Sequence, residues 1–329
     1  MDAAQLKAAI LEAVPLRDSL STVETEAACA VYSAAVKELY RRDGEDALEW
    51  AASDLPTGLR PGILSDLMKQ MAVDSPDLMK TWADRFRGEY GERWAKQCDL
   101  SAVIGAAGRG AAELLRVREL LSTVALPNSA SSYPADFDFQ LLVTGSAPVW
   151  TLEEPVSYWA ARDKEDSWEG VKHVVESMPG KGTNLVGHVF NGVRAMEGEE
   201  KAAGWMVGKL GELHPQLRRR AIQQLFLAEV GTEGTVALIR GFPDPADKMA
   251  LVSSQLRSFL PSSSVAALKA LESPQLQAEV LMDSVAATGG TGPAAERNRA
   301  FFISTMAQLQ LDPQARQRIM EALSAPPSR

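Results

Sequence analysis

Two glycine-rich segments contain residue types that bind nucleotide phosphates in other proteins, but at the wrong spacing. Gly105, Gly108 and Gly110 follow a short apolar run in the order G-x-x-G-x-G, whereas a dinucleotide-binding turn needs G-x-G-x-x-G between a strand and a helix. Gly180 and Lys181 lack both the earlier glycine and the following Ser or Thr of a P-loop. The first segment therefore predicts a glycine-loosened or closely packed helix, and the second an interhelical turn.

The histidines His173, His188 and His214 are the side chains best suited to hold a metal ion. Glu169 and His173 are four residues apart and would share one helix face, with Glu176 three residues further on. A zinc site needs three or four ligands, and neither an H-E-x-x-H motif nor a cysteine pair supplies the rest. A helical enzyme with a metal site around Glu169, His173 and His188 is one alternative; the main expectation is that no metal is bound.

Cys98 is the candidate nucleophile, because Lys96 two residues away could lower the pKa of its thiol. No histidine is close to it in sequence, and neither a G-x-S-x-G elbow nor a kinase signature occurs. The chain therefore predicts no catalytic residue and no cofactor, and we expect a protein that is not an enzyme.

The densest basic cluster is formed by Arg218, Arg219 and Arg220, in a helix that is expected to begin at Pro215. Residues 1–200 hold 20 Lys and Arg against 32 Asp and Glu, whereas the remaining residues hold 14 against 11. Nucleic-acid phosphates are bound by several such cations at once. An alternative function is therefore nucleic-acid binding through the basic C-terminal part.

The composition is that of an ordinary globular protein, which excludes several functional classes. Of the 329 residues, 46 % are hydrophobic and 23 % are charged, with a net charge of −9, so most of the chain is expected to fold. Two cysteines cannot form a disulfide scaffold, and no apolar run approaches the roughly 20 residues of a membrane span. The first residues lack a secretory signal pattern, so we expect a cytoplasmic protein that does not bind membranes.

Apolar residues recur at spacings of three and four along nearly the whole chain, as on one face of an α-helix. The first such set includes Leu6 and Leu11, and the second includes Val31 and Leu39. Alanine, leucine, methionine and glutamine, which favour helices, fill these segments. The pattern predicts an all-α fold.

Seven prolines follow residues typical of turns or helix caps, and we expect each at the first position of a helix, where its missing N–H costs nothing. From Pro215 onward, successive prolines of this kind are 30, 29, 19 and 20 residues apart. Thirty residues is about the length of one helical-hairpin repeat. The seven are Pro76, Pro155, Pro215, Pro245, Pro274, Pro293 and Pro313.

A Trp-Ala pair recurs late in three short predicted helices, at Trp50, Trp82 and Trp159. A large ring at one place in each unit is suited to fill the gap between stacked hairpins, so we expect these rings to be core anchors. With these residues the chain resembles the Trp-Ala-type helical repeats of uncharacterised bacterial proteins and, in unit length, HEAT and tetratricopeptide arrays. The resemblance covers about residues 40–90 and 150–320, and it implies an irregular helical solenoid (an alpha-alpha superhelix) that serves as an interaction scaffold.

The segment 122–152 interrupts the helical pattern with prolines, serines and glycine. We expect a long irregular loop or linker here, between an N-terminal helical lobe of residues 1–121 and a C-terminal helical-repeat lobe of residues 153–329. Within the loop, residues 136–141 alternate polar and apolar, as in an extended strand. The aromatic residues of the loop that we expect to be exposed are Phe137, Phe139 and Trp150.

The repeat pattern and the missing catalytic constellation together predict a non-enzymatic scaffold or adaptor that binds another protein within a larger assembly. Its expected contacts are the Arg218, Arg219 and Arg220 cluster and the aromatic residues of the loop. Nucleic acid is the first alternative partner, and the metal-dependent helical enzyme is the second alternative.

Overall fold

The fold consists of helices throughout the part of the chain that the structure, a computed structural model, describes. It describes residues 1–18, 22–121, 124–145, 152–178, 182–225, 230–257, 261–287 and 293–324. These residues form the helices α1 to α19 and two 3-10 helices, η1 and η2, and none of them lies in a strand. None of these helices combines the length and the apolar character that crossing a membrane requires. The all-α prediction is confirmed.

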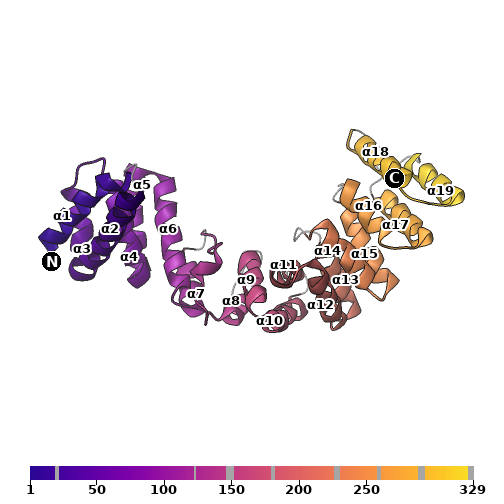
Figure 1. The fold of residues 1–329 in the computed structure, drawn as a ribbon, viewed down its shortest axis with the longest axis horizontal. Helices are drawn as coiled ribbons and strands as arrows, with labels where there is room; N and C mark the ends of the chain where they lie inside the picture. The colour runs from indigo at the N-terminus through magenta and orange to yellow at the C-terminus, as the bar shows by residue number, and fades with distance from the viewer. Residues whose placement is uncertain are drawn as a thin grey trace. The chain divides into compact units, whose positions relative to one another are not determined.

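The chain divides into two compact units, residues 1–142 and 143–329. The helices of unit 1 are α1 (Ala3–Ala13), η1 (Val14–Asp18), α2 (Thr22–Asp43), α3 (Glu45–Ser53), α4 (Arg60–Asp74), α5 (Pro76–Tyr90), α6 (Glu92–Ala107), α7 (Ala111–Leu120) and η2 (Ala130–Ser132). From α1 to α7, each α-helix contacts the next one along the chain, and α4 also contacts α2 and α6 (Figure 1). The division between the units falls within α8 (Phe139–Gly145).

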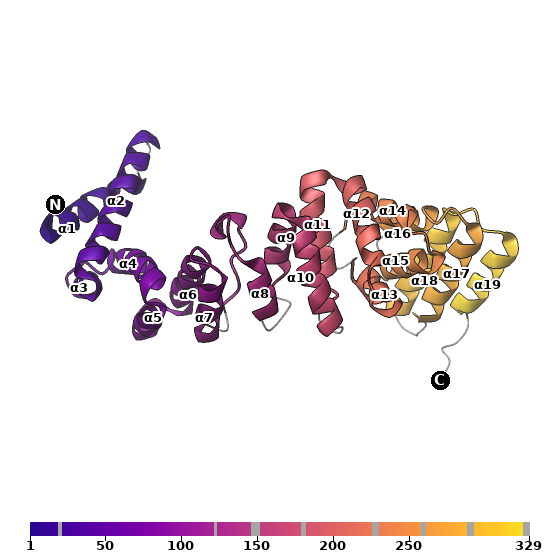
Figure 2. The same cartoon turned by 90° about the horizontal axis from the view of Figure 1, so that it is seen from below.

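Unit 2 is built from helices most of which contact every second helix along the chain and a sequence neighbour as well. Its helices are α9 (Glu153–Arg162), α10 (Lys164–Ser177), α11 (Leu185–Glu197), α12 (Glu199–Gly211), α13 (Pro215–Gln224), α14 (Thr232–Gly241), α15 (Pro245–Leu256), α16 (Pro261–Lys269), α17 (Pro274–Ala287), α18 (Pro293–Ala307) and α19 (Pro313–Ser324). The odd-numbered helices α9 to α19 contact one another in succession, and so do the even-numbered helices α12 to α18 (Figures 1 and 2). Equivalent helices of successive hairpins therefore lie side by side, as in a helical-repeat protein.

Proline marks most of the helix starts that the sequence predicts. Six of the seven prolines stand at the first position of their helices, α5, α13, α15, α17, α18 and α19. In α15 the preceding residue completes the cap, because the Oδ1 atom of Asp244 accepts the N–H of Ala246 at 2.9 Å. Pro155 is instead the third residue of α9, which begins at Glu153.

The repeated tryptophans are buried to different degrees. Trp82 and Trp159 are buried, whereas Trp50 is half-buried. Each buried ring donates its indole N–H to a carboxylate: Trp82 to Glu45 and Trp159 to Asp166, both at 3.0 Å. These hydrogen bonds satisfy the one polar group of each ring, which lets the rest of the ring serve as the expected core anchor.

The strand expected at residues 136–141 is wrong. The Oδ1 atom of Asp138 accepts the backbone N–H of Leu141 at 2.7 Å, as a side chain does at the start of a helix. α8 begins at the next residue, Phe139. The alternation of polar and apolar residues therefore belongs to a turn and a helix cap.

Candidate protein-binding surface

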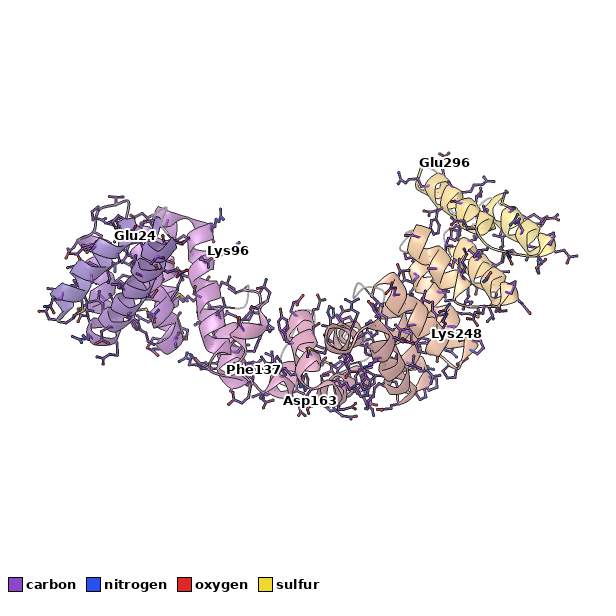
Figure 3. All side chains as sticks on the ribbon, viewed as in Figure 1. Glu24, Lys96, Phe137, Asp163, Lys248 and Glu296 are labelled. Carbon is purple, nitrogen blue, oxygen red and sulfur yellow. The ribbon has the colours of Figure 1, made fainter. Side chains whose placement is uncertain are left out.

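The aromatic residues of the segment 122–152 do not form the exposed surface that the sequence predicts. Phe137 and Phe139 are buried (Figure 3 labels Phe137). Both rings pack on Tyr133, with ring centroids 4.9 and 5.4 Å from its own, and Tyr133 donates its hydroxyl to the carbonyl of Pro127 at 2.8 Å. These rings form a small core for this segment, so their expected exposure is wrong. Trp150 lies outside the described residues.

The basic cluster on α13 is only partly available to a partner. The Nε atom of Arg218 lies 2.8 Å from Oδ2 of Asp247, a buried residue in the first turn of α15. Burial raises the pKa of Asp247, and the guanidinium of Arg218 opposes that rise. Arg219 and Arg220 are exposed. Arg218 therefore joins α13 to α15, and only the other two arginines present free charge at the surface.

The histidines do not gather at a metal site. His173 is exposed on α10, and His188 is half-buried on α11. Burial lowers the pKa of His188, although Glu153 and Glu154 act in the opposite direction. Within the described ranges, no three His, Cys, Asp or Glu side chains are placed to hold a metal ion together. Nothing in the geometry favours the metal-dependent enzyme.

Cys98 is an unreactive core residue. Its side chain is 1 % exposed, and burial raises the pKa of its thiol to about 12, against the opposing effect of a hydrogen bond with Ser65. Lys96 is exposed and, two residues away on α6, points to another side of the helix. The expectation that Lys96 lowers the pKa of this thiol is wrong, and the thiol stays protonated at neutral pH.

The glycines of the first glycine-rich segment serve helix packing and a turn. A Cβ atom on Gly105 would lie 2.9 Å from Cγ2 of Val73, so α6 approaches α4 closely at this point. Gly110 precedes α7 with φ at +114°, a conformation that favours glycine. Gly180 and Lys181 lie outside the described residues. Gly105 and Gly110 thus have structural roles that need no nucleotide.

A hollow of about 330 Å³ lies in the first hairpin of unit 1, between α1, η1 and α2; we call it the α1–α2 hollow. Each side of the hairpin contributes four residues at the spacing i, i+3, i+4 and i+7, which is one face of a helix. Residues near the end of α1 thereby meet residues near the start of α2, as in an antiparallel pair. The lining residues are Ala9, Glu12, Ala13 and Leu16 on one side, and Glu24, Ala27, Ala28 and Val31 on the other.

The hairpin that forms this hollow exposes much apolar surface. Leu16 is 49 % exposed and Val31 is 52 % exposed. Five of the ten exposed large hydrophobic side chains among the described residues belong to this hairpin, the others here being Met1, Leu11 and Val23. Two of the five, Leu16 and Val31, line the hollow together, and exposed apolar side chains that lie together are more typical of an interaction site than isolated ones.

The charge at the α1–α2 hollow is negative. Glu12 and Glu24, the charged residues that line it, are both exposed, and Figure 3 shows Glu24 on α2. Among the side chains that the structure describes, no Lys or Arg lines the hollow. The basic side chain of Lys7 on α1 does not line the hollow and lies over the ring of Trp50, 5.1 Å from its centroid. The hollow therefore combines an apolar floor with two carboxylates.

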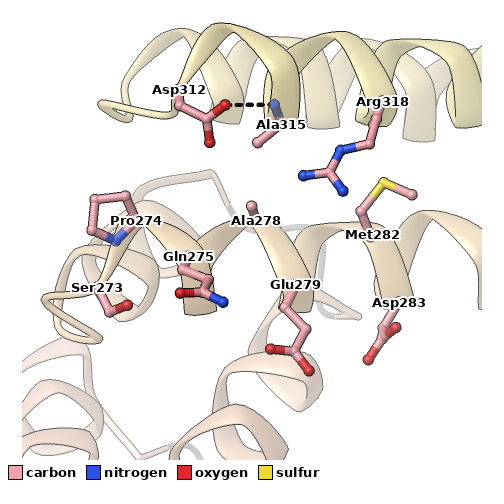
Figure 4. A pocket seen from close by; sticks show the side chains of 10 residues that line it. All are labelled: Ser273, Pro274, Gln275, Ala278, Glu279, Met282, Asp283, Asp312, Ala315 and Arg318. Atoms are coloured by element: carbon pink, nitrogen blue, oxygen red, sulfur yellow. Dashed lines mark hydrogen bonds between the residues drawn. The ribbon is translucent and has the colours of Figure 1, made fainter.

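Two larger grooves lie between helices of unit 2 and are more polar. One, of about 800 Å³, separates α17 from α19 (Figure 4). Arg318 extends from α19 toward Met282, whereas Glu279 and Asp283 extend away from α19. The other, of about 610 Å³, lies between α12 and α14. Neither groove has large exposed hydrophobic side chains among its lining residues, so the α1–α2 hollow is the stronger candidate for a protein contact.

The α1–α2 hollow was missed at the sequence level because its residues look like part of the core. Val31 belongs to an apolar set at helical spacing, yet its side chain is exposed. The feature of the sequence that could have predicted the hollow is the width of the apolar face of each helix. On α2, Val31 stands directly before the buried Tyr32, so the apolar face extends beyond the side of the helix that packs on the core.

The comparisons with known proteins leave the family open. No family model matches the chain, and neither a curated protein nor a solved structure matches it. The likeness to HEAT and Trp-Ala-type repeats therefore stays a resemblance.

Proposed function

We propose that this protein is a non-enzymatic scaffold or adaptor, that it binds another protein within a larger assembly, and that the α1–α2 hollow is its contact surface. The observation that supports this most is the group of exposed hydrophobic side chains on the α1–α2 hairpin, of which Leu16 and Val31 line the hollow.

A partner that covers this surface removes apolar area from water, which is worth about 25 cal/mol per Å². Four of the eight residues that line the hollow are alanines, so a partner's larger side chains have room to enter. We place this binding in the cytoplasm, where free cysteines such as Cys29 and Cys98 stay reduced.

Nucleic-acid binding is the alternative that the test below can detect, because Arg219 and Arg220 are exposed on α13. These two cations are few for a phosphate surface, since each contact contributes separately to affinity and to its salt dependence. The specific observations favour the protein contact.

The test is site-specific photo-crosslinking in the native host. A photo-reactive amino acid replaces Val31 in one variant and Ile104, which is 42 % exposed on α6, in the control. We expect a crosslink to one identified protein from position 31 and none to that protein from position 104, followed by binding of the two purified proteins. Identical crosslinks from both positions, none from position 31, or crosslinks to nucleic acid alone would contradict the proposal.

A further inference from the structure

We infer that the occupant of the α1–α2 hollow is an amphipathic α-helix of the partner protein that carries large apolar side chains on one face and Lys or Arg along the borders of that face. This inference rests on the proposed function and adds the chemistry of the partner.

The shape of the hollow favours a helix. Its two walls present residues at the same spacing, i, i+3, i+4 and i+7, along two antiparallel helical segments. A third helix packs its own ridge of side chains into a groove of this kind. The same chain contains an example of three helices packed in this way, because α4, α5 and α6 all contact one another.

Among the helices that the structure describes, none lines this side of the first hairpin as a third helix. The principal contacts of α1 are with α2 and η1, and Leu16 and Val31 stay about half exposed as a result. An added helix would complete for α1 and α2 the packing that α4 to α6 already have.

The floor of the hollow determines the size of the side chains that fit. Ala9, Ala13, Ala27 and Ala28 stand where the two helices face the hollow, and short side chains on both helices leave room for knobs from a third. Leucine, methionine or phenylalanine on the partner would fill this space, whereas alanine would leave a void that costs stability.

The sign of the charge distinguishes a basic partner from a second copy of this chain. Glu12 and Glu24 would approach the same carboxylates in a symmetric dimer, because such an interface pairs one surface with itself. Like charges in that position are destabilising. Residues 1–142 hold 15 Lys and Arg against 22 Asp and Glu, so the whole unit favours a basic partner.

The experiment selects peptides of about 18 residues from a display library of amphipathic helices, in which apolar and charged positions vary independently. The target is the full chain, and peptides that also bind the Val31→Asp variant are removed. We expect the remaining peptides to be helical when bound and rich in Lys and Arg beside a face of large apolar residues.

A charge exchange then tests the role of the two carboxylates. The double variant Glu12→Lys, Glu24→Lys should weaken a selected basic peptide about tenfold, as two exposed ion pairs allow, and should bind the charge-reversed peptide better than the native chain does. The control Glu26→Lys changes an exposed residue of α2 that does not line the hollow, and it should leave both affinities within about twofold.

Several outcomes would overturn the inference. Acidic, neutral or extended peptides among the Val31-dependent binders would do so, and so would a selection that yields no such binder. Val31-dependent dimerisation in sedimentation velocity would assign the surface to a second copy. In each case a partner crosslinked from position 31 would still support the proposed scaffold function, so the two conclusions fail separately.

Discussion

At the scale of single residues, Arg218 illustrates why exposed charge must be separated from structural charge. Its guanidinium pairs with a carboxylate of Asp247 that is almost completely buried. We expect Arg218→Ala to lower the free energy of unfolding by about 3 kcal/mol at pH 7, because it leaves a buried charge without its partner. Arg219→Ala, on the exposed side of α13, should change it by less than about 0.5 kcal/mol. Urea unfolding of both variants provides the measurement.

The cost of Arg218→Ala should also depend on pH. Burial raises the pKa of Asp247 in the folded protein above its usual value of 3.8, and removal of Arg218 raises it further. A group with a raised folded pKa stabilises the fold more as the pH falls through that value, so the deficit of the variant should shrink between pH 7 and pH 4. An equal deficit at both pH values would show that the pair matters through packing alone.

Single side chains are also where sequence reasoning failed most clearly. Phe137 and Phe139 lie in a segment that looks like a loop, yet they are core residues because Tyr133 folds onto them. Val31 lies in an apolar set that looks like core, yet it is exposed because none of the described helices covers that side of α2. In both cases burial depends on what the rest of the chain places nearby, which local spacing does not contain.

At the scale of elements, the crossing of α9 and α11 depends on a residue without a side chain. A Cβ atom on Gly192 would lie 2.2 Å from the carbonyl oxygen of Ser157 and 2.7 Å from Cβ of Ala160. Gly192→Ala should therefore destabilise the protein by about 1–3 kcal/mol through overpacking. The matched control is Gly208→Ala on α12, where nothing lies within 4 Å of the added atom.

The control substitution, Gly208→Ala, should change the stability of the protein in the opposite direction. Alanine is favoured over glycine by about 0.5–1 kcal/mol inside a helix when no clash occurs, so Gly208→Ala should raise the thermal unfolding midpoint while Gly192→Ala lowers it. Two shifts of the same sign would mean that the helices separate easily at this crossing.

Helix starts were predictable because the responsible physics is local. Proline at the first position and a capping residue before it need only a few neighbouring residues, and six of the seven predicted starts are confirmed. Asp138 caps a helix by the same local chemistry, but its alternation with phenylalanine suggested a strand. Helical hairpins and the all-α class were therefore accessible from sequence, whereas the open side of α1 and α2 was not.

At the scale of the whole molecule, the division into residues 1–142 and 143–329 predicts how the protein unfolds. Each unit has its own buried residues, such as Leu67 on α4 in the first and Leu238 on α14 in the second. The division falls inside the segment 122–152 that the sequence marks as a linker, although the three-part boundaries stay a prediction.

Units with separate cores unfold as separate cooperative transitions when few interactions couple them. Leu67→Ala should cost about 3 kcal/mol and shift only the transition of unit 1, and the matched Leu238→Ala should shift only that of unit 2. In urea, labelling of Cys98, which is buried in unit 1, would report the unfolding of that unit, and circular dichroism would report the unfolding of the whole chain. If Leu238→Ala moves the labelling transition as far as Leu67→Ala does, the chain unfolds as one cooperative body, and a partner bound at the α1–α2 hollow would then stabilise unit 2 as well as unit 1.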